Sequence, residues 1–422
     1  MKHPTQRLLT AMILGFTAGL IAKGLVSSPE VLLPWITGLT KPIGTLFIRL
    51  ILMLVIPLLV SALIIGVLEA GSGDAHGKMG IRTLIIVVIL SGLSVLIGLG
   101  LVNWVQPGKW VPREALQAMQ HTLPPPSESK GFWASVLEIV PTNPLKEAAF
   151  AFDPQNSEGG ILAVMFFALF IGIAMLGVPE EQCRPVREFF QSLFSISQKG
   201  LHLILKMAPL AVACFLFNLG AQLGLEGFRM IGIYVAVVLG ALLLHGVGVY
   251  SLVLIFGARQ NPIEFFKKTS DALLMAFSTS SSNATLPKSL EVAEFNLKLP
   301  KSVSRFVLTI GASANQNGTA LFEGVTILFL AQAYGIPLSF AQQLQVAGLC
   351  ILAGVGTAGV PSASIPFIAA VGAGVGIPLE GVTLILGVDR FLDMCRTTVN
   401  VGGDLVVAAV VARGYKEAKT EI

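Results

Sequence analysis

The stretch 387–404, GVDRFLDMCRTTVNVGGD, stands out because it gathers charged and amide side chains within an otherwise apolar part of the chain. Five of these residues follow one another at separations of 4, 3, 4 and 4 positions: Asp389, Asp393, Arg396, Asn400 and Asp404. On an α-helix this spacing places all five on one face. We call these five residues the polar stripe.

The composition explains why the polar stripe needs a function. Of the 422 residues, 54% are hydrophobic and 12% are charged, and the mean hydropathy is +0.79. Soluble domains carry about 25% charged residues, so we expect a polytopic membrane protein. A charge near the bilayer centre costs about 2.5–3.5 kcal/mol, so the stripe must line a wet cavity or a binding site. A site for a charged solute is favoured over internal ion pairs between two helices. The stretch has more carboxylate and amide groups than its two arginines, Arg390 and Arg396, can neutralise.

Other features of the composition narrow the class. The net charge of +4 comes from basic loops and does not indicate a nucleic-acid partner. The first apolar run, 8–26, lacks a small-residue cleavage site after it, so we expect it to remain as the first span. The four cysteines have neither metal-ligand nor disulfide spacing, and we expect no bound cofactor.

Apolar runs of spanning length occur at six places before residue 258: 8–26, 43–68, 83–105, 160–178, 187–222 and 228–257. The run 187–222 contains Lys199, His202 and Lys206, which predicts an oblique or partly buried helix. The polar segment 106–159 contains three consecutive prolines and is expected to be an external loop with short helical pieces. With eight spans in all, most basic loops lie on one side, so both termini are expected in the cytoplasm.

Two later segments each consist of two short apolar arms around a break. Segment 262–299 breaks at STSSSN, and segment 340–376 breaks at GVGTAGVPSASIP. Each arm is too short to span, so each segment predicts a re-entrant hairpin, and a pair of interrupted segments is a good indicator of a transporter binding site. The alternative is loops on short interfacial helices.

Between these hairpins, the apolar segment 304–332 is interrupted by GASANQNGTALFEG. Glycines and the consecutive amides Asn315, Gln316 and Asn317 unwind a helix and free carbonyl oxygens, which suit an alkali cation. An NQNGT sequence is also typical of an ordinary turn. Its position in the middle of an apolar span favours the cation site.

Four motifs in this chain resemble the signature motifs of a known family: TSSSNATLP at 279–287, NQNGTALFEG at 315–324, GTAGVP at 356–361 and DRFLDMCRTTVNVGGD at 389–404. The family is that of the dicarboxylate/amino acid:cation symporters, the glutamate transporter family, in its prokaryotic type. The resemblance covers essentially the whole chain. It implies an all-α membrane protein with eight transmembrane helices, two re-entrant helical hairpins and inverted repeats.

The resemblance also implies an oligomeric assembly and two functional parts in each protomer. The protein would be a homotrimer in the cell inner membrane, surrounded by lipid, and each protomer would move its solute like an elevator. The scaffold would comprise 1–80, with spans one and two, and 106–225, with the external loop and spans four and five. The transport domain would comprise 81–105, with span three, and 226–422, with span six, the hairpins at 262–299 and 340–376, and spans seven and eight.

The resemblance assigns roles to single residues. Asp393 would bind the substrate's amino group and Arg396 its side-chain carboxylate, and the chemistry agrees, since a guanidinium offers a planar fork to a carboxylate. The other implied substrate contacts are Ser281, Ser282, Thr319, Gly359, Val360, Thr397 and Asn400. One sodium ion would bind Asp404 with carbonyls of Gly311, Asn315 and Asn400. A second would bind backbone at 356–360 together with Ser313 and Gln316.

Departures from the family pattern are informative. Asn317 and Leu90 stand where an aspartate and a threonine would help to bind a third sodium ion, so that site is expected to be empty or weak. Other members have a second substrate-site arginine at the position of Ser280 or at that of Met394. This chain has an arginine at neither position, and Arg390 is the candidate for its role. Glu323 resembles the glutamate that carries a proton in animal members. The alternative is a protonated glutamate with a structural role only.

These observations favour a symporter that imports glutamate or aspartate with Na⁺, H⁺ or both. A membrane enzyme is disfavoured because no HExxH is present and the five histidines lie outside the motifs. A solute-gated channel is disfavoured because interlocking hairpins would occlude the solute. Within transport, a C4-dicarboxylate carrier should not need Asp393, and a neutral amino-acid carrier should not need Arg396.

Overall fold

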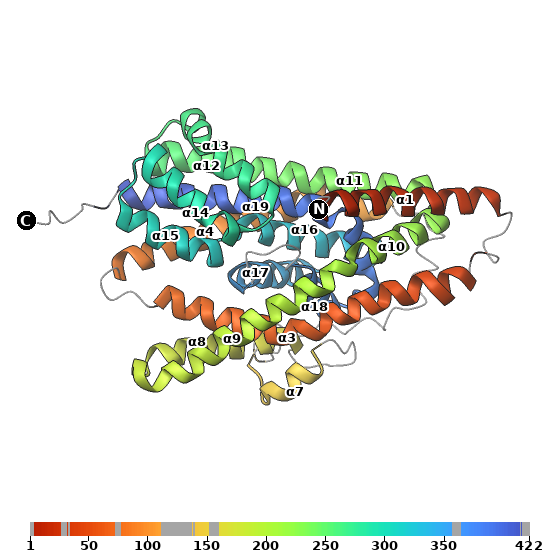
Figure 1. The fold of residues 1–422 in the computed structure, drawn as a ribbon, viewed down its shortest axis with the longest axis horizontal. Coiled ribbons are helices and arrows are strands. Elements are labelled where there is room, and N and C mark those ends of the chain that lie inside the picture. Colours follow the sequence, from red (N-terminus) through yellow and green to blue (C-terminus); the bar gives the residue numbers. More distant parts are fainter. Residues whose placement is uncertain are drawn as a thin grey trace, which may run out of the picture.

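The computed structural model describes residues 4–26, 32, 34–71, 77–110, 137, 140–151, 160–356, 364–413 and 415. Within these ranges the regular structure is helical throughout and no strand occurs, as the long apolar runs predict. Many of the helices lie along one long axis, and the last described helix, which ends at Arg413, reaches one end of it (Figure 1).

Among the described residues, five helices are long and apolar enough to cross a membrane: Gly38–Leu68, Met79–Trp110, Glu180–Gln222, Arg229–Ala258 and Leu384–Arg413. Four further apolar helices are shorter: Thr10–Leu25, Ala163–Leu176, Phe340–Gly354 and Ser364–Gly374. These helices coincide with the apolar runs of the sequence and support a multi-pass membrane protein. The number of spans and the depth of the shorter helices in a bilayer stay predictions.

The first helix, α1 (Pro4–Leu25), packs along α10 (Ala208–Leu223) at very short range. A Cβ atom on Gly15 would lie 2.3 Å from the carbonyl oxygen of Ala213, so a larger residue would force the two backbones apart. Glycine at this position therefore makes the close approach of α1 and α10 possible.

A second group of helices surrounds α3 (Lys41–Gly71), which continues from the π-helical turn η1 (Ile36–Thr40). α3 packs against α8 (Gly160–Leu176) and α9 (Glu180–Ile204). The short helix α7 (Pro144–Ala149) packs against α8. The proline-rich part of the loop that leads to α7 lies outside the described residues.

The run expected to be oblique, 187–222, changes its helical geometry in the middle. α9 gives way to the 3-10 turn η3 (Leu205–Met207), and α10 begins directly after it with Pro209 in its first turn. Proline is tolerated in the first turn of a helix because its missing N–H would have no intrahelical acceptor there.

Two long elements flank the centre of the molecule. α4 (Gly77–Val105) is followed by η2 (Pro107–Trp110). α11 (Leu225–Leu243) continues through η4 (Leu244–Val249), α12 (Tyr250–Leu252) and η5 (Val253–Ala258), so this rod contains two π-helical turns. A π-helical turn rotates the side chains that follow it, and such turns are frequent at functional sites.

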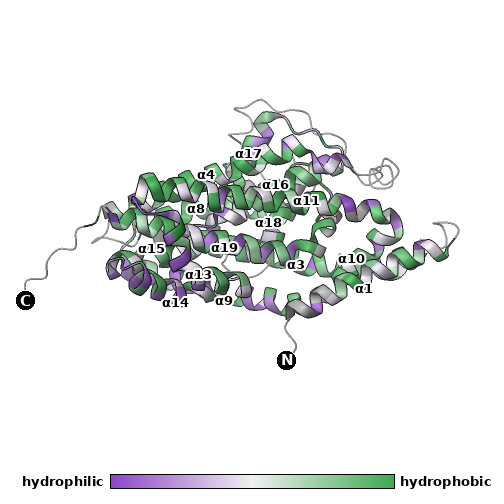
Figure 2. Ribbon diagram, turned by 90° about the horizontal axis from the view of Figure 1, so that it is seen from above, coloured by the Kyte–Doolittle hydropathy of each residue, from purple (hydrophilic) through white to green (hydrophobic). Residues whose placement is uncertain are grey.

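The segment 262–299 consists of α13 (Pro262–Thr279), α14 (Ser282–Glu291) and η6 (Val292–Asn296). α13 and α14 contact each other and are joined by a turn at Ser280, whose φ of 51° lies in the left-handed region. Hydrophilic residues gather around these two helices, near one end of the molecule (Figure 2).

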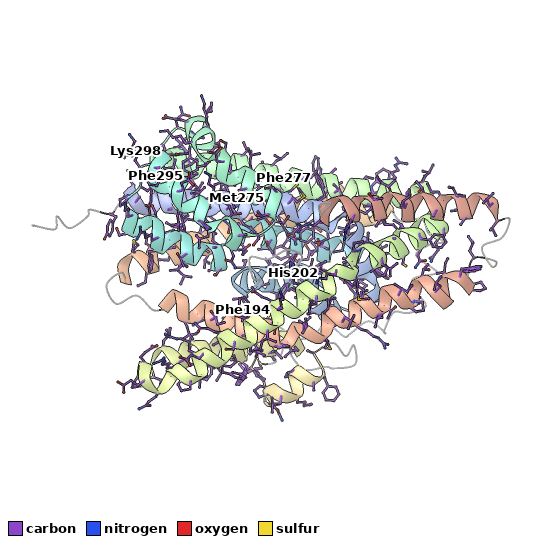
Figure 3. All side chains as sticks on the ribbon, in the orientation of Figure 1. Phe194, His202, Met275, Phe277, Phe295 and Lys298 are labelled. Atoms are coloured by element: carbon purple, nitrogen blue, oxygen red, sulfur yellow. The ribbon has the colours of Figure 1, made fainter. Side chains whose placement is uncertain are left out.

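Four labelled side chains show the direction of the segment 262–299. Phe295 and Lys298 lie toward the end of the molecule, whereas Met275 and Phe277 lie closer to its middle (Figure 3). The turn between α13 and α14 therefore points from the end of the molecule toward its centre.

The last elements enclose the polar stripe. α15 (Lys301–Ala314) and α16 (Asn317–Ala333) are separated at residues 315–316. α17 (Phe340–Gly356) and α18 (Ser364–Gly374) follow, with 357–363 outside the described residues. After η7 (Leu379–Val382) comes α19 (Thr383–Arg413), which contacts α10, α11, α13, α15 and α16. Most of the apolar part of α19 is buried inside the protein.

Candidate functional site

The polar stripe lies on α19 and is buried over its whole length. The exposed fraction is 2% for Asp389, 3% for Asp393, 2% for Arg396, 1% for Asn400 and 4% for Asp404. The sequence prediction that these residues avoid lipid is therefore confirmed. Because buried charges must be paired or hydrogen-bonded, the partners of each residue indicate what the site can bind.

Arg396 lies between two carboxylates of its own helix. Its Nη1 donates to Oδ1 of Asp389 at 3.2 Å, and its Nη2 lies 2.8 Å from Oδ1 of Asp393. Arg390 reaches the other oxygen of Asp393, with 3.4 Å between Nη1 and Oδ2. Two arginines and two aspartates thus balance one another, so this half of the stripe forms ion pairs within its own helix.

An aromatic ring covers the guanidinium of Arg396. The centre of the guanidinium lies 4.2 Å from the centroid of the Phe322 ring, on α16, which is a favourable cation–π distance. The ring occupies the face of the guanidinium and leaves its N–H edges for carboxylates. Phe322 was not singled out by the sequence, because an aromatic residue in an apolar helix gives no signal of its own.

Glu323 follows Phe322 on α16 and is fully buried. Neither of its carboxyl oxygens has a hydrogen-bond partner among the described residues. A charged carboxylate without a partner is costly to bury. Glu323 therefore has the surroundings in which a carboxyl group can bind and release a proton.

Asn400 connects α19 to the break between α15 and α16. Its Oδ1 accepts from the backbone N–H groups of Gly318 at 2.7 Å and Thr319 at 3.3 Å. Its Nδ2 donates to Thr319 Oγ1 at 2.9 Å and to Gln316 Oε1 at 2.5 Å. Asn400 thus places the hydroxyl of Thr319 and the amide of Gln316 beside the stripe.

Asp404 lies over the backbone of α15. A Cβ atom on Gly311 would lie 2.5 Å from Asp404 Oδ1, which explains why glycine is found there. The same oxygen accepts from Asn315 Nδ2 at 2.8 Å, and Asn315 Oδ1 has no hydrogen-bond partner among the described residues. An anionic oxygen and a free amide oxygen therefore lie together in a buried place, as hard ligands of an alkali cation would.

The neighbouring residue Asn317 has a different environment. Its Oδ1 accepts from Ser91 Oγ at 2.7 Å, and its backbone carbonyl accepts from Ser94 Oγ at 2.9 Å. Its Nδ2 donates to the hydroxyl of Tyr250 at 3.1 Å. Direct hydrogen bonds thus engage both ends of this amide, and the weak or empty third cation site stays a prediction.

The remaining predicted residues are placed as follows. Ser281 accepts from the backbone N–H of Ala284 and so caps α14, and Ser282 is buried with no partner for its hydroxyl among the described residues. Thr397 is buried on α19, and Ser313 is half-buried on α15. Gly359 and Val360 lie outside the described residues, as does most of the backbone at 356–360.

The part of the chain that the structure describes contains no group of three His, Cys, Asp or Glu side chains that could hold a metal ion. A cation bound near Asp404 would need neutral oxygens from amides and carbonyls to complete its coordination. Asn315 and the backbone after Ala314 lie at the break itself, and Asn400 contacts the break from α19.

Comparisons with known proteins identify the family of this chain. The model of the sodium:dicarboxylate symporter family matches residues 5–414. The proton/sodium-glutamate symport protein of Bacillus subtilis (strain 168) is 34% identical over 429 aligned positions, which cover 98% of this chain and 94% of that protein. The proton/glutamate-aspartate symporter of Escherichia coli (strain K12) is 30% identical and covers 96% of this chain and 92% of its own length. Excitatory amino acid transporter 3 of Homo sapiens is 30% identical, covering 89% of this chain and 79% of that protein.

Proposed function

Because this chain belongs to the sodium:dicarboxylate symporter family, we propose that it imports acidic amino acids together with Na⁺, H⁺ or both. The observation that carries this proposal is the buried arrangement around Arg396. A guanidinium held at two edges by Asp389 and Asp393, with Phe322 on its face, is ready to exchange one carboxylate for another.

The exchange can be written in terms of charges. When an acidic amino acid enters, its side-chain carboxylate replaces Asp393 at Nη2 of Arg396. Asp393, released from Arg396, then accepts the substrate's ammonium group. The main-chain carboxylate is left for the amide of Asn400 and the hydroxyl of Thr319. Every charge of the substrate thus finds an opposite charge or a donor, as burial in a low-dielectric site requires.

Arg390 contributes a second positive charge to this site. It already lies 3.4 Å from Asp393 and its side chain is 19% exposed. When Asp393 turns to the substrate's ammonium group, Arg390 can remain paired with its other oxygen. We therefore assign Arg390 to orienting Asp393, and the substrate's side-chain carboxylate to Arg396.

Cation coupling is assigned to the other end of the stripe. Asp404, Asn315 and the carbonyl oxygens near Gly311 and Asn400 would bind one Na⁺, which moves as cargo. Gln316, Ser313 and backbone at 356–360 would contribute to a second. Glu323 would carry a proton, since its carboxyl group is buried and no described residue bonds to it.

The larger architecture is proposed from the family and from the helix boundaries. Eight spans, re-entrant hairpins at 262–299 and 340–376, a homotrimer and an elevator motion belong to this proposal. So do the scaffold at 1–80 and 106–225, the transport domain at 81–105 and 226–422, and cytoplasmic termini in the cell inner membrane. The turn between α13 and α14, which points toward the centre of the molecule, supports the placement of the first hairpin (Figure 3).

Uptake into proteoliposomes tests the proposal directly. The purified protein is reconstituted, and radiolabelled aspartate, glutamate and succinate are offered under an imposed sodium gradient, an imposed proton gradient or neither. We expect accumulation of aspartate or glutamate with at least one of the gradients and little uptake of succinate. Equal uptake of succinate would indicate a dicarboxylate carrier instead, because succinate has no ammonium group for Asp393 to bind.

A further inference from the structure

Tyr250 is a buried polar residue that the proposed transport cycle does not yet use. It is 1% exposed and directly follows the π-helical turn η4. Its hydroxyl donates to the backbone carbonyl of Val399 on α19 at 3.1 Å and accepts from Asn317 Nδ2 at 3.1 Å. One hydroxyl group thus joins α12, α19 and the first residue of α16.

The position of this hydroxyl relative to the cation residues can be read from Gly403. A Cβ atom on Gly403 would lie 2.4 Å from the hydroxyl oxygen of Tyr250, and 3.1 Å from the side-chain nitrogens of both Asn315 and Asn317. These three polar groups therefore converge over the backbone of the residue that precedes Asp404. Asn315 in turn donates to Asp404 at 2.8 Å.

This convergence fixes groups that would otherwise be free to move. Residues 315 and 316 lie between two helices: the N–H of Asn315 still bonds to the carbonyl of Gly311, and the carbonyl of Gln316 still accepts from the N–H of Ala320. The side-chain hydrogen bonds add contacts that hold these two helix ends against their neighbours. Tyr250 bonds Asn317 from one side while Ser91 bonds it from the other, so the start of α16 is fixed against both α12 and α4. The ring of Tyr250 is itself held in place by His245, with 4.8 Å between the ring centroids and an interplanar angle of 70°.

From this geometry we propose that Tyr250 is a positioning residue for the cation site of Asp404. Its hydroxyl, through Asn317 and across Gly403, keeps Asn315 and the backbone of the break in the arrangement that a cation needs. The inference rests on the proposed cation coupling and extends it to a residue that touches neither cation nor substrate.

Removing the hydroxyl tests this role, and the chain offers a matched control. Tyr234 is also fully buried, and its hydroxyl shares a 2.7 Å hydrogen bond with Thr326, likewise on α16 but away from the break. Tyr250→Phe and Tyr234→Phe each delete one buried hydroxyl that bonds to α16. Only the hydroxyl of Tyr250 lies beside the cation residues.

The measurement is the unfolding temperature of the purified full chain as sodium chloride replaces choline chloride at constant total salt. We expect Tyr250→Phe to raise the half-saturating sodium concentration by about fivefold, the factor that corresponds to losing one hydrogen bond of about 1 kcal/mol. Tyr234→Phe should leave that concentration within about twofold of wild type. Both variants are expected to lose some stability in choline, which a purely structural role also predicts.

Two further outcomes separate the possibilities. In an Asn317→Ala background, Tyr250→Phe should change the half-saturating sodium concentration little further, because the Tyr250–Asn317 hydrogen bond is already absent. Equal half-saturating sodium in wild type and Tyr250→Phe overturns this inference and leaves the proposed function standing. A wild-type protein whose unfolding temperature does not respond to sodium overturns the sodium site of Asp404 itself, and this inference with it.

Discussion

The two halves of the α19 polar stripe differ in how their charges are balanced. From Asp389 to Arg396, two aspartates and the arginines 390 and 396 pair with one another within the helix. From Asn400 to Asp404, the one acidic side chain accepts from the neutral amide of Asn315, its only hydrogen-bond donor among the described residues. The first half can exchange ion pairs with a charged solute, whereas the second half has an unbalanced negative charge that a cation can neutralise.

This difference explains how one helix can couple two kinds of cargo. An ion-pair network rearranges when a zwitterionic, acidic solute enters, without a change in its own net charge. A lone buried carboxylate is costly until a cation or a proton arrives. The predictions below alter one half at a time, from the largest expected effect to the smallest.

The largest effect is expected from Arg396→Cys. The change removes the guanidinium that pairs with both Asp389 and Asp393, and breaking a buried ion pair typically costs about 3–5 kcal/mol. Binding of aspartate should weaken by more than about 100-fold, while small neutral amino acids gain access. Equilibrium binding with the purified protein checks this, and aspartate affinity within about tenfold of wild type would remove Arg396 from the substrate site.

Asp393→Asn should abolish amino-acid uptake while the fold survives. The amide keeps the shape of the side chain but removes the anion that would face the substrate's ammonium group. Uptake into proteoliposomes and size-exclusion chromatography are measured on the same preparation. A variant that keeps its oligomeric state and still transports aspartate normally would make Asp393 a structural residue.

Asp404→Asn alters the other half of the stripe. Here the substrate residues are untouched, and the anion that would neutralise Na⁺ is lost. We expect the half-saturating sodium concentration for uptake to rise by about tenfold or more, as loss of one charge-assisted contact predicts. Aspartate affinity at saturating sodium should change much less, and an equal loss of both would show that the two halves are not separable.

The smallest effect on binding is expected from Glu323→Gln. Because neither carboxyl oxygen has a partner among the described residues, the amide should fit without breaking a bond there. Substrate affinity should stay within about threefold of wild type, while the dependence of uptake on external pH disappears. A pH profile that matches the wild type would give Glu323 a structural role only.

Much of this arrangement is predictable from the sequence, because it depends on local pattern. The spacing of the stripe residues fixes their common face on a helix, and the amides at 315–317 mark the break where α15 ends and α16 begins. The polar interruption at 278–283 likewise marks the turn between α13 and α14. Each of these signals lies within a few neighbouring residues.

The partners that these residues choose depend on tertiary packing and could not be predicted in the same way. The contact of Phe322 with Arg396 joins α16 to α19, and Tyr250 reaches Asn317 across 67 positions of the chain. Ser91 and Ser94 on α4 likewise bond the side chain and the backbone of Asn317, respectively, across 226 and 223 positions. The pairing of Arg396 with Asp389 needs the rotamers of both side chains, which spacing alone does not provide.

The central claim is that one stripe couples an acidic amino acid to few cations, with Asn317 closing the third site and Glu323 carrying a proton. Reversal potentials of aspartate transport in proteoliposomes test it most directly, because they report the number of each ion that moves per substrate. We expect fewer than three Na⁺ per aspartate, a dependence on the proton gradient, or both. Three Na⁺ per aspartate with no proton would contradict the roles of both Asn317 and Glu323.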